Sequence, residues 1–197
     1  MTASTSVETW RQEIEPRLES LEARLCAACV AAGRPRSEVR LIAVSKRKPA
    51  AAIRAAHALG LRDFGESYAQ ELRDKADELA DLEGLCWHFI GHLQRNKVRL
   101  VAGRASWLHT VAKASLVDAL AQRLAGSSPD KARLRDTTEP LSVLLQLSLA
   151  GEEQKSGASG DELPALLSRV AQHSQLRCRG LMTMPPASDD PAAAGPI

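Results

Sequence analysis

Leu41-Ile42-Ala43-Val44-Ser45-Lys46-Arg47-Lys48-Pro49 is the stretch of sequence that decides the fold. Its first four residues form a short, uninterrupted apolar run, which is typical of a strand that is buried on both faces. Pro49 then opens a helix with apolar residues at helical spacing, which closes at Gly60. A strand followed at once by a helix is the repeating unit of an α/β fold.

The same alternation of strand and helix continues along the chain. Further strands are expected at residues 62–65, 86–91, 107–111, 141–147 and 176–184. Further helices are expected through residues 72–79 and over 96–102, 114–124 and 161–173, with Asp161 as a candidate N-cap or first-turn acid. Six strand–helix units, the last without its helix, predict an α/β fold with a parallel sheet. The closed form of such a sheet is the eight-fold TIM barrel, which typically needs about 250 residues. The open form is a doubly wound sheet, and the alternation alone does not distinguish the two.

The two ends of the chain carry different signals. Apolar residues at helical spacing predict a helix from Val7 to Ala28, which Pro16 should kink or divide and Gly33 should end. Residues 187–197 are rich in Pro and Ala and are expected to be an unstructured tail. Residues 1–186 are expected to be a single domain, and if its sheet is a barrel it holds about six of the eight units. Such a sheet has two unpaired edges, so it is open, or the chain is a fragment, or something else completes it.

Composition excludes several classes of protein. The 197 residues carry 26 basic and 24 acidic side chains, a formal net charge of +2, and only 3% are aromatic, which gives no support for a nucleic-acid partner. The four cysteines are scattered, and no segment reads as a signal peptide or a membrane span. A soluble cytoplasmic protein without a membrane partner is expected, with a monomer as the default.

Lys46 is the first candidate for chemistry, because it closely follows the first strand. Barrels and open α/β sheets place their active sites at this end of the strands. A lysine that is partly desolvated there offers a neutral amine, as Schiff-base formation with an aldehyde requires. The alternative is a solvated basic turn of Lys46, Arg47 and Lys48, which local sequence alone favours because lysines are mostly exposed.

His88 lies within the third expected strand. Alternation places His88 and Ile90 on one face and Trp87 and Phe89 on the other. His88 could therefore line a pocket, or it could be a hydrogen-bonded core histidine.

Three further groups of residues could have a function, but in each case a purely structural role is favoured. The turn at residues 94–97 could bind an anion, although capping by Asn96 is favoured. Residues 155–157 could form a functional loop, although a solvated charge cluster is favoured. Cys26 and Cys29 form a Cys-x-x-Cys pair without a second pair, so core packing is favoured and no metal site is expected.

Five ordered stretches together resemble the family of pyridoxal phosphate homeostasis proteins, which is related in fold to the N-terminal barrel of alanine racemase. The stretches are Leu41-Ile42-Ala43-Val44-Ser45-Lys46-Arg47-Lys48-Pro49, Phe64-Gly65-Glu66-Ser67-Tyr68-Ala69-Gln70-Glu71, Trp87-His88-Phe89-Ile90-Gly91-His92-Leu93-Gln94-Arg95-Asn96-Lys97, Lys155-Ser156-Gly157 and Arg179-Gly180-Leu181-Met182-Thr183-Met184-Pro185.

The resemblance implies a TIM-type barrel that binds pyridoxal 5'-phosphate. It implies that Lys46 holds this cofactor as a Schiff base and that Ser67, His88 and Met182 contribute to the binding site. It also implies an intracellular carrier and regulator of the cofactor, with no catalytic residue assigned, because turnover would need a positioned acid or base on the other ring face.

Three departures from the family pattern qualify what the resemblance implies. Ser67 and Ser148 stand where the family usually has Asn. The family also continues for two more strand–helix units, which carry residues that bind the cofactor phosphate. Two other hypotheses therefore stay open: a truncated remnant that does not bind the cofactor, and an amino-acid racemase-like enzyme, for which Tyr68 is the only tyrosine.

Overall fold

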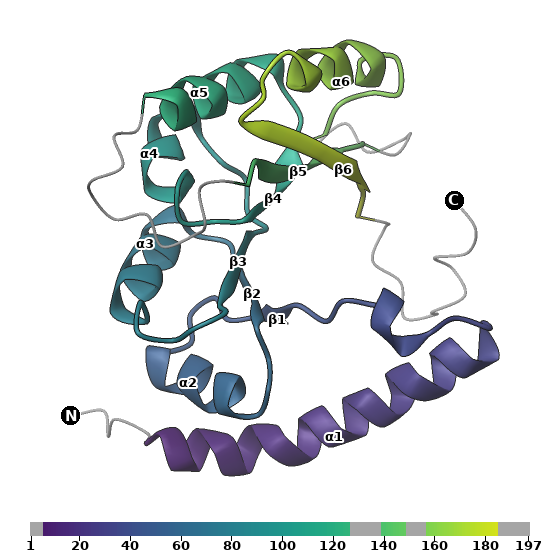
Figure 1. Cartoon of the computed structure of the whole chain (residues 1–197), viewed down its shortest axis with the longest axis vertical. Coiled ribbons are helices and arrows are strands. Elements are labelled where there is room, and N and C mark those ends of the chain that lie inside the picture. The colour runs from purple at the N-terminus through teal and green to yellow at the C-terminus, as the bar shows by residue number, and fades with distance from the viewer. Residues whose placement is uncertain (1–5, 127–138, 149–156, 185–197) are drawn as a thin grey trace.

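Six parallel strands form one sheet in the computed structural model, which describes residues 6–126, 139–148 and 157–184 (Figure 1). The strands are β1 (Ala43–Val44), β2 (Asp63–Glu66), β3 (Cys86–Phe89), β4 (Trp107–Val111), β5 (Leu141–Gln146) and β6 (Leu176–Met182). Each strand pairs with the next one along the chain. A doubly wound sheet reverses its strand order at a switch point, whereas a barrel adds strands in sequence. The consecutive order β1 to β6 is therefore that of a barrel.

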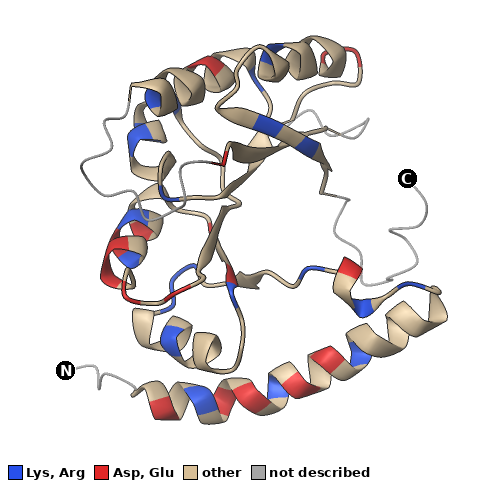
Figure 2. Ribbon diagram, viewed as in Figure 1, with Lys and Arg blue, Asp and Glu red and all other residues tan. Residues whose placement is uncertain are grey.

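Five of the six α-helices in the described part of the chain, α2 to α6, cover one side of the sheet (Figure 1). The helices are α1 (Val7–Ala31), α2 (Ala50–Ala58), α3 (Ala69–Glu78), α4 (Val98–Val101), α5 (Ala114–Ala125) and α6 (Leu163–Ala171), with short 3₁₀ turns η1 (Arg36–Glu38) and η2 (Arg95–Lys97). Figure 1 shows α2 to α6 on the outer side of the curved sheet, and α1 packs against α2. In Figure 2 acidic and basic residues are spread along α1 and α3. Within the described residues no helix is long and apolar enough to cross a membrane.

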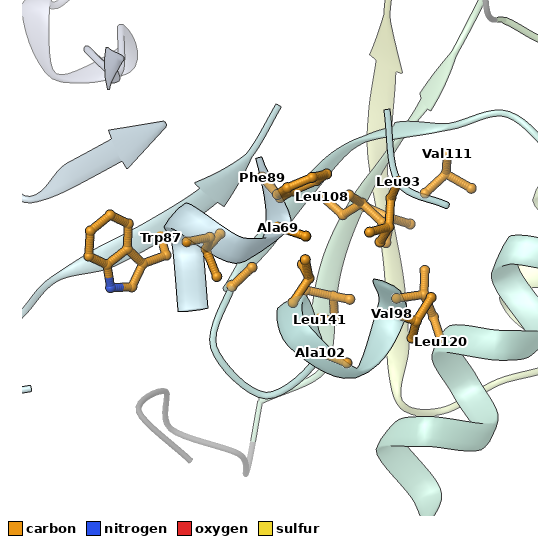
Figure 3. Close-up of a cluster of buried hydrophobic side chains, with 14 of the residues drawn as sticks. Ala69, Trp87, Phe89, Leu93, Val98, Ala102, Leu108, Val111, Leu120 and Leu141 are labelled. Atoms are coloured by element: carbon orange, nitrogen blue, oxygen red, sulfur yellow. The ribbon is translucent and has the colours of Figure 1, made fainter. Parts of the chain in front are cut away.

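The core lies between the outer face of the sheet and these helices. Figure 3 shows strand residues such as Phe89, Leu108 and Leu141 meeting Val98 and Leu120 from α4 and α5, and all five are buried. Burial of such side chains contributes about 1.5–3 kcal/mol each, so this layer holds the strand ends in place.

Strand alternation at β3 is as the sequence predicted. Trp87 and Phe89 belong to the apolar core, whereas His88 contacts polar residues of the neighbouring strands. The face of a strand residue follows from its place in the sequence because successive side chains point to opposite sides.

Three local predictions were wrong. Pro16 does not divide α1 into two helices, since α1 runs without interruption for 25 residues. Pro16 is exposed, so water can satisfy the carbonyl that loses its helical partner. Asp161 is not an N-cap: α6 begins at Leu163, and the preceding Glu162 uses its carboxylate to accept from Ser159 instead. The helix expected over 96–102 is split between η2 and α4.

Other expectations fall partly outside the described residues. The single-domain boundary at 186 and the tail over 187–197 lie there, as do Lys155 and Ser156, and they stay predictions. Of the Cys-x-x-Cys pair, Cys29 is buried and Cys26 is exposed, so packing accounts for only one of the two.

Candidate functional site

Lys46 lies in a tight turn at the carboxyl end of β1. The turn closes where Lys48 N–H donates to the Ser45 carbonyl oxygen at 3.0 Å. Arg47, its third residue, has φ of 60°, and it is the only described non-glycine residue with positive φ. Glycine or asparagine is the usual residue at such a position, because a side chain there is crowded. Lys46 therefore lies just beyond the end of β1, as the sequence predicted, and its side chain is exposed.

A buried ion pair lies behind this turn. The Lys75 ammonium on α3 donates to Glu66 Oε1 at the end of β2 (2.7 Å) and to the Ser45 carbonyl oxygen (2.8 Å). Ser45 Oγ also donates to Glu66 Oε1 at 2.7 Å. The exposed fraction is 0% for Glu66 and 8% for Lys75, so the pair is shielded from water. Neither residue was singled out from the sequence, where Lys75 reads as one of several charges on a helix.

Glu71 joins this ion pair to the other side of the turn. Its carboxylate accepts from Lys75 Nζ at 2.9 Å and from Arg47 N–H at 2.8 Å. Desolvation alone would raise the pKa of the Glu71 carboxyl, but these two hydrogen bonds and the positive charges of Lys75 and Arg47 together outweigh it, and the pKa lies below its usual value. The Arg47 guanidinium donates to the Tyr68 hydroxyl at 3.1 Å and lies over the Tyr68 ring. The only tyrosine of the chain is therefore beside the Lys46 turn.

Ser67 and Met182 also lie at the carboxyl edge of the sheet. Ser67 directly follows β2 and is half-buried, and its carbonyl passes so close to Gly91 that a Cβ there would lie 2.0 Å from the oxygen. Met182 is the last residue of β6 and its carbonyl accepts from Leu147 N–H at 2.8 Å. Lys46, Ser67 and Met182 thus lie at one edge because parallel strands end together, although β1 and β6 are the outermost of the six strands.

His88 is held by protein partners at both ring nitrogens. Nε2 lies 2.8 Å from Asp63 Oδ1 and Nδ1 lies 2.9 Å from His109 Nε2. A carboxylate only accepts, so Nε2 carries the proton and Nδ1 accepts from His109. Desolvation lowers the pKa of His88, and it lowers the pKa of His109 to about 4 with help from His88. Both rings are therefore neutral near pH 7.

Cys86 completes a group of metal-ligand types with Asp63 and His88. One ligand atom of each residue lies within 4.8 Å of the others. Burial, together with the Asp63 charge, raises the pKa of the Cys86 thiol to about 11, so the thiol is protonated at neutral pH. A metal would have to displace that proton and the one on His88 Nε2. Sequence reasoning missed this group because its members come from two strands, with only the spacing of Cys86 and His88 as a local signal.

A hollow of about 670 Å³ opens beyond the ends of β3 and β4. Gln94 and Asn96 line it, together with Lys113 from the start of α5 and Gly157. Asn96 does not act as the helix cap that was favoured, because residue 94 takes that position without a side-chain hydrogen bond. The anion-binding interpretation of this turn stays a prediction.

Comparisons with known proteins agree with the architecture. Residues 18–195 match the family model described as the N-terminal domain of alanine racemase. Over 180 residues the chain is 44% identical to the pyridoxal phosphate homeostasis protein of Pseudomonas aeruginosa, a match that covers 91% of this chain and 74% of the relative.

Solved structures share the fold. One is a crystal structure of an unknown protein from Bifidobacterium adolescentis, with a TM-score of 0.80 at 26% identity over 93% of this chain and 74% of that one. Another is PipY of Synechococcus elongatus, solved with PLP (pyridoxal phosphate) bound, with a TM-score of 0.68 at 35% identity over 88% of this chain and 74% of that one.

Proposed function

The chain belongs to the family of pyridoxal phosphate homeostasis proteins, which have the fold of the alanine racemase N-terminal domain, and from this premise we propose that it binds pyridoxal 5'-phosphate and serves the intracellular homeostasis of that cofactor. The observation that carries the proposal is the place of Lys46. Its side chain is exposed at the carboxyl end of β1, in a turn whose backbone is held on one side by the buried Lys75 and on the other by the half-buried Glu71.

The cofactor supplies a reversibly reactive aldehyde when it is bound. In the proposed linkage, Lys46 Nζ bonds to the aldehyde carbon as a Schiff base, and the aldehyde oxygen leaves as water. An exposed primary amine on a fixed backbone fits this role, because the amine can reach a ligand while its attachment point does not move.

Ser67 and Met182 are proposed to contact the cofactor from the ends of β2 and β6. Both lie at the carboxyl ends of the strands, as Lys46 does, and both are half-buried, so part of each residue is accessible to a ligand. The contribution of His88 stays a prediction: its two ring nitrogens already have protein partners and its side chain is 1% exposed, so a direct contact with the cofactor would need its neighbours to move.

We propose a carrier rather than an enzyme. A racemase-like activity would need a second acid or base facing the ligand. Tyr68 is the one tyrosine available, and its hydroxyl already accepts a hydrogen bond from Arg47. Racemisation of an amino acid by the purified chain with added cofactor would favour the enzyme. The cytoplasmic location is proposed on composition alone.

The test is a titration of the purified full chain with pyridoxal phosphate. The chain should gain the visible absorption of a lysine Schiff base, and borohydride reduction should leave a cofactor adduct on the peptide containing Lys46. Lys46→Ala should lose both signals. Lys48→Ala is the matched control, since the Lys48 ammonium lies 5.4 Å from the Trp10 ring and should not be needed. Equal spectra for the unsubstituted chain and Lys46→Ala would refute the assignment.

A further inference from the structure

We infer that Glu66, Lys75 and Glu71 form a positioning device for Lys46, an inference that rests on the proposed function and goes beyond it. Lys75 and Glu71 bond to the backbone on either side of Lys46, and its side chain stays exposed. Glu66 bonds to Lys75 and to the Ser45 hydroxyl. They act through the turn, so they are positioning residues and have no contact with the cofactor in the proposal.

The backbone is held at two points that flank Lys46. On one side Lys75 Nζ donates to the Ser45 carbonyl oxygen (2.8 Å), and on the other Glu71 accepts from Arg47 N–H (2.8 Å). The same two side chains bond to each other at 2.9 Å, one helical turn apart on α3. The turn that carries Lys46 is therefore clamped to a single helix face.

The turn needs such a clamp because its conformation is unfavourable by itself. Arg47 adopts φ of 60° although its side chain is crowded there, and the chain has neither Gly nor Asn at this position. A residue in the left-handed region persists only when its surroundings determine it. Arg47 N–H and the Ser45 carbonyl are the groups whose hydrogen bonds select this conformation.

Glu66 makes the clamp rigid. One carboxylate oxygen accepts from both Lys75 and Ser45 Oγ, while the other is buried and has no hydrogen-bond partner among the described residues. Burial of an ion pair is seldom the most stable choice for a core, and one reason to keep it is to specify a single geometry. Here the geometry specified is that of the residues before and after Lys46.

The clamp therefore sets the fraction of molecules in which the turn holds Lys46 in the geometry that binds the cofactor. If the clamp is weakened, the turn samples other conformations, and the apparent affinity for the aldehyde falls with the competent fraction. A charge-assisted hydrogen bond shifts such an equilibrium by about tenfold or more. Pyridoxal phosphate binding should therefore depend on residues that never touch it.

Two variants of the full chain test this inference. Glu71→Ala removes the acceptor for Arg47 N–H at a side chain that is 30% exposed, so the fold tolerates it. Glu66→Gln combined with Lys75→Met removes both buried charges at once, so neither is left unpaired. Asp81→Asn is the matched control, because Asp81 pairs with Arg54 of α2 at 2.6 Å and not with the Lys46 turn.

Each protein is titrated with pyridoxal phosphate, and thermal unfolding is followed in parallel. We expect an about tenfold or greater loss of apparent affinity in Glu71→Ala and in the double variant, and wild-type affinity in Asp81→Asn. Lys75→Arg keeps a cation facing Glu66 and should retain affinity better than the double variant. Folded test variants that bind as tightly as the unsubstituted chain would overturn the inference, even if their melting temperatures fall. An unsubstituted chain that forms no Schiff base would instead refute the proposed function.

Discussion

Replacing Lys75 by Met should be among the most damaging single changes in this chain. The substitution leaves the Glu66 carboxylate, which is 0% exposed, without its cation. Glu66 Oε1 keeps the hydrogen bond from Ser45 Oγ, the Ser45 carbonyl keeps Lys48 N–H, and Glu71 is exposed enough to be solvated. The cost is therefore mainly that of one unpaired buried charge, and removal of one partner from a buried pair costs about 3–5 kcal/mol of unfolding free energy.

Urea denaturation followed by circular dichroism measures this loss. The double variant Glu66→Gln, Lys75→Met should unfold at a higher urea concentration than Lys75→Met alone. Its free energy of unfolding should be higher by about 2 kcal/mol, because burying an amide costs far less than burying a carboxylate. Asp81→Asn, which breaks an ion pair with one partner 61% exposed, should change stability by about 1 kcal/mol or less. If Lys75→Met were no more destabilising than Asp81→Asn, the buried pair would not have the role argued for it.

Three other perturbations follow from the structure. Gly91→Ala should destabilise the chain by about 2 kcal/mol or more in urea titrations, because its Cβ would lie 2.0 Å from a backbone oxygen, whereas Gly160→Ala, with nothing within 4 Å, should not. Cys86 should react with iodoacetamide much more slowly than the exposed Cys26 at pH 7.5, since burial raises its thiol pKa to about 11; comparable rates by mass spectrometry would contradict this. The pKa of His109 is lowered to about 4, so the unfolded chain binds the extra proton between about pH 6.5 and 4 and stability should fall as the pH drops through that window. His109→Gln should reduce that acid sensitivity in unfolding curves measured at pH 7 and pH 5.

The position and exposure of Lys46 could both be predicted from the residues next to it in the sequence. The apolar run before it predicted a strand, and the strand ends just before it, as expected. Local sequence also favoured a solvated basic turn, and the side chain is indeed exposed. The two interpretations do not exclude each other, because the turn presents the amine to solvent while Lys75 and Glu71 hold its backbone.

The partners of that turn could not be read from the sequence. Lys75 lies 30 residues from Ser45, and Glu71 lies 24 residues from Arg47, so no spacing rule joins them. Likewise, the alternation at β3 predicted the face on which His88 lies, but its bonds to Asp63 and His109 depend on the register of β3 with its neighbours.

The sequence by itself determined the order of strands and helices, the faces of β3 and the place of Lys46 at a strand end. These features follow from periodicity and from residues next to one another in the chain. The alternation of strands and helices did not distinguish a barrel from an open sheet; the family resemblance implied a barrel, and the strand order of the tertiary structure is that of one. Only the tertiary structure decided that Arg47 takes a left-handed conformation and that a buried Glu66–Lys75 pair lies behind Lys46. Each of these depends on which distant segments pack together, and burial then sets which polar groups must find partners.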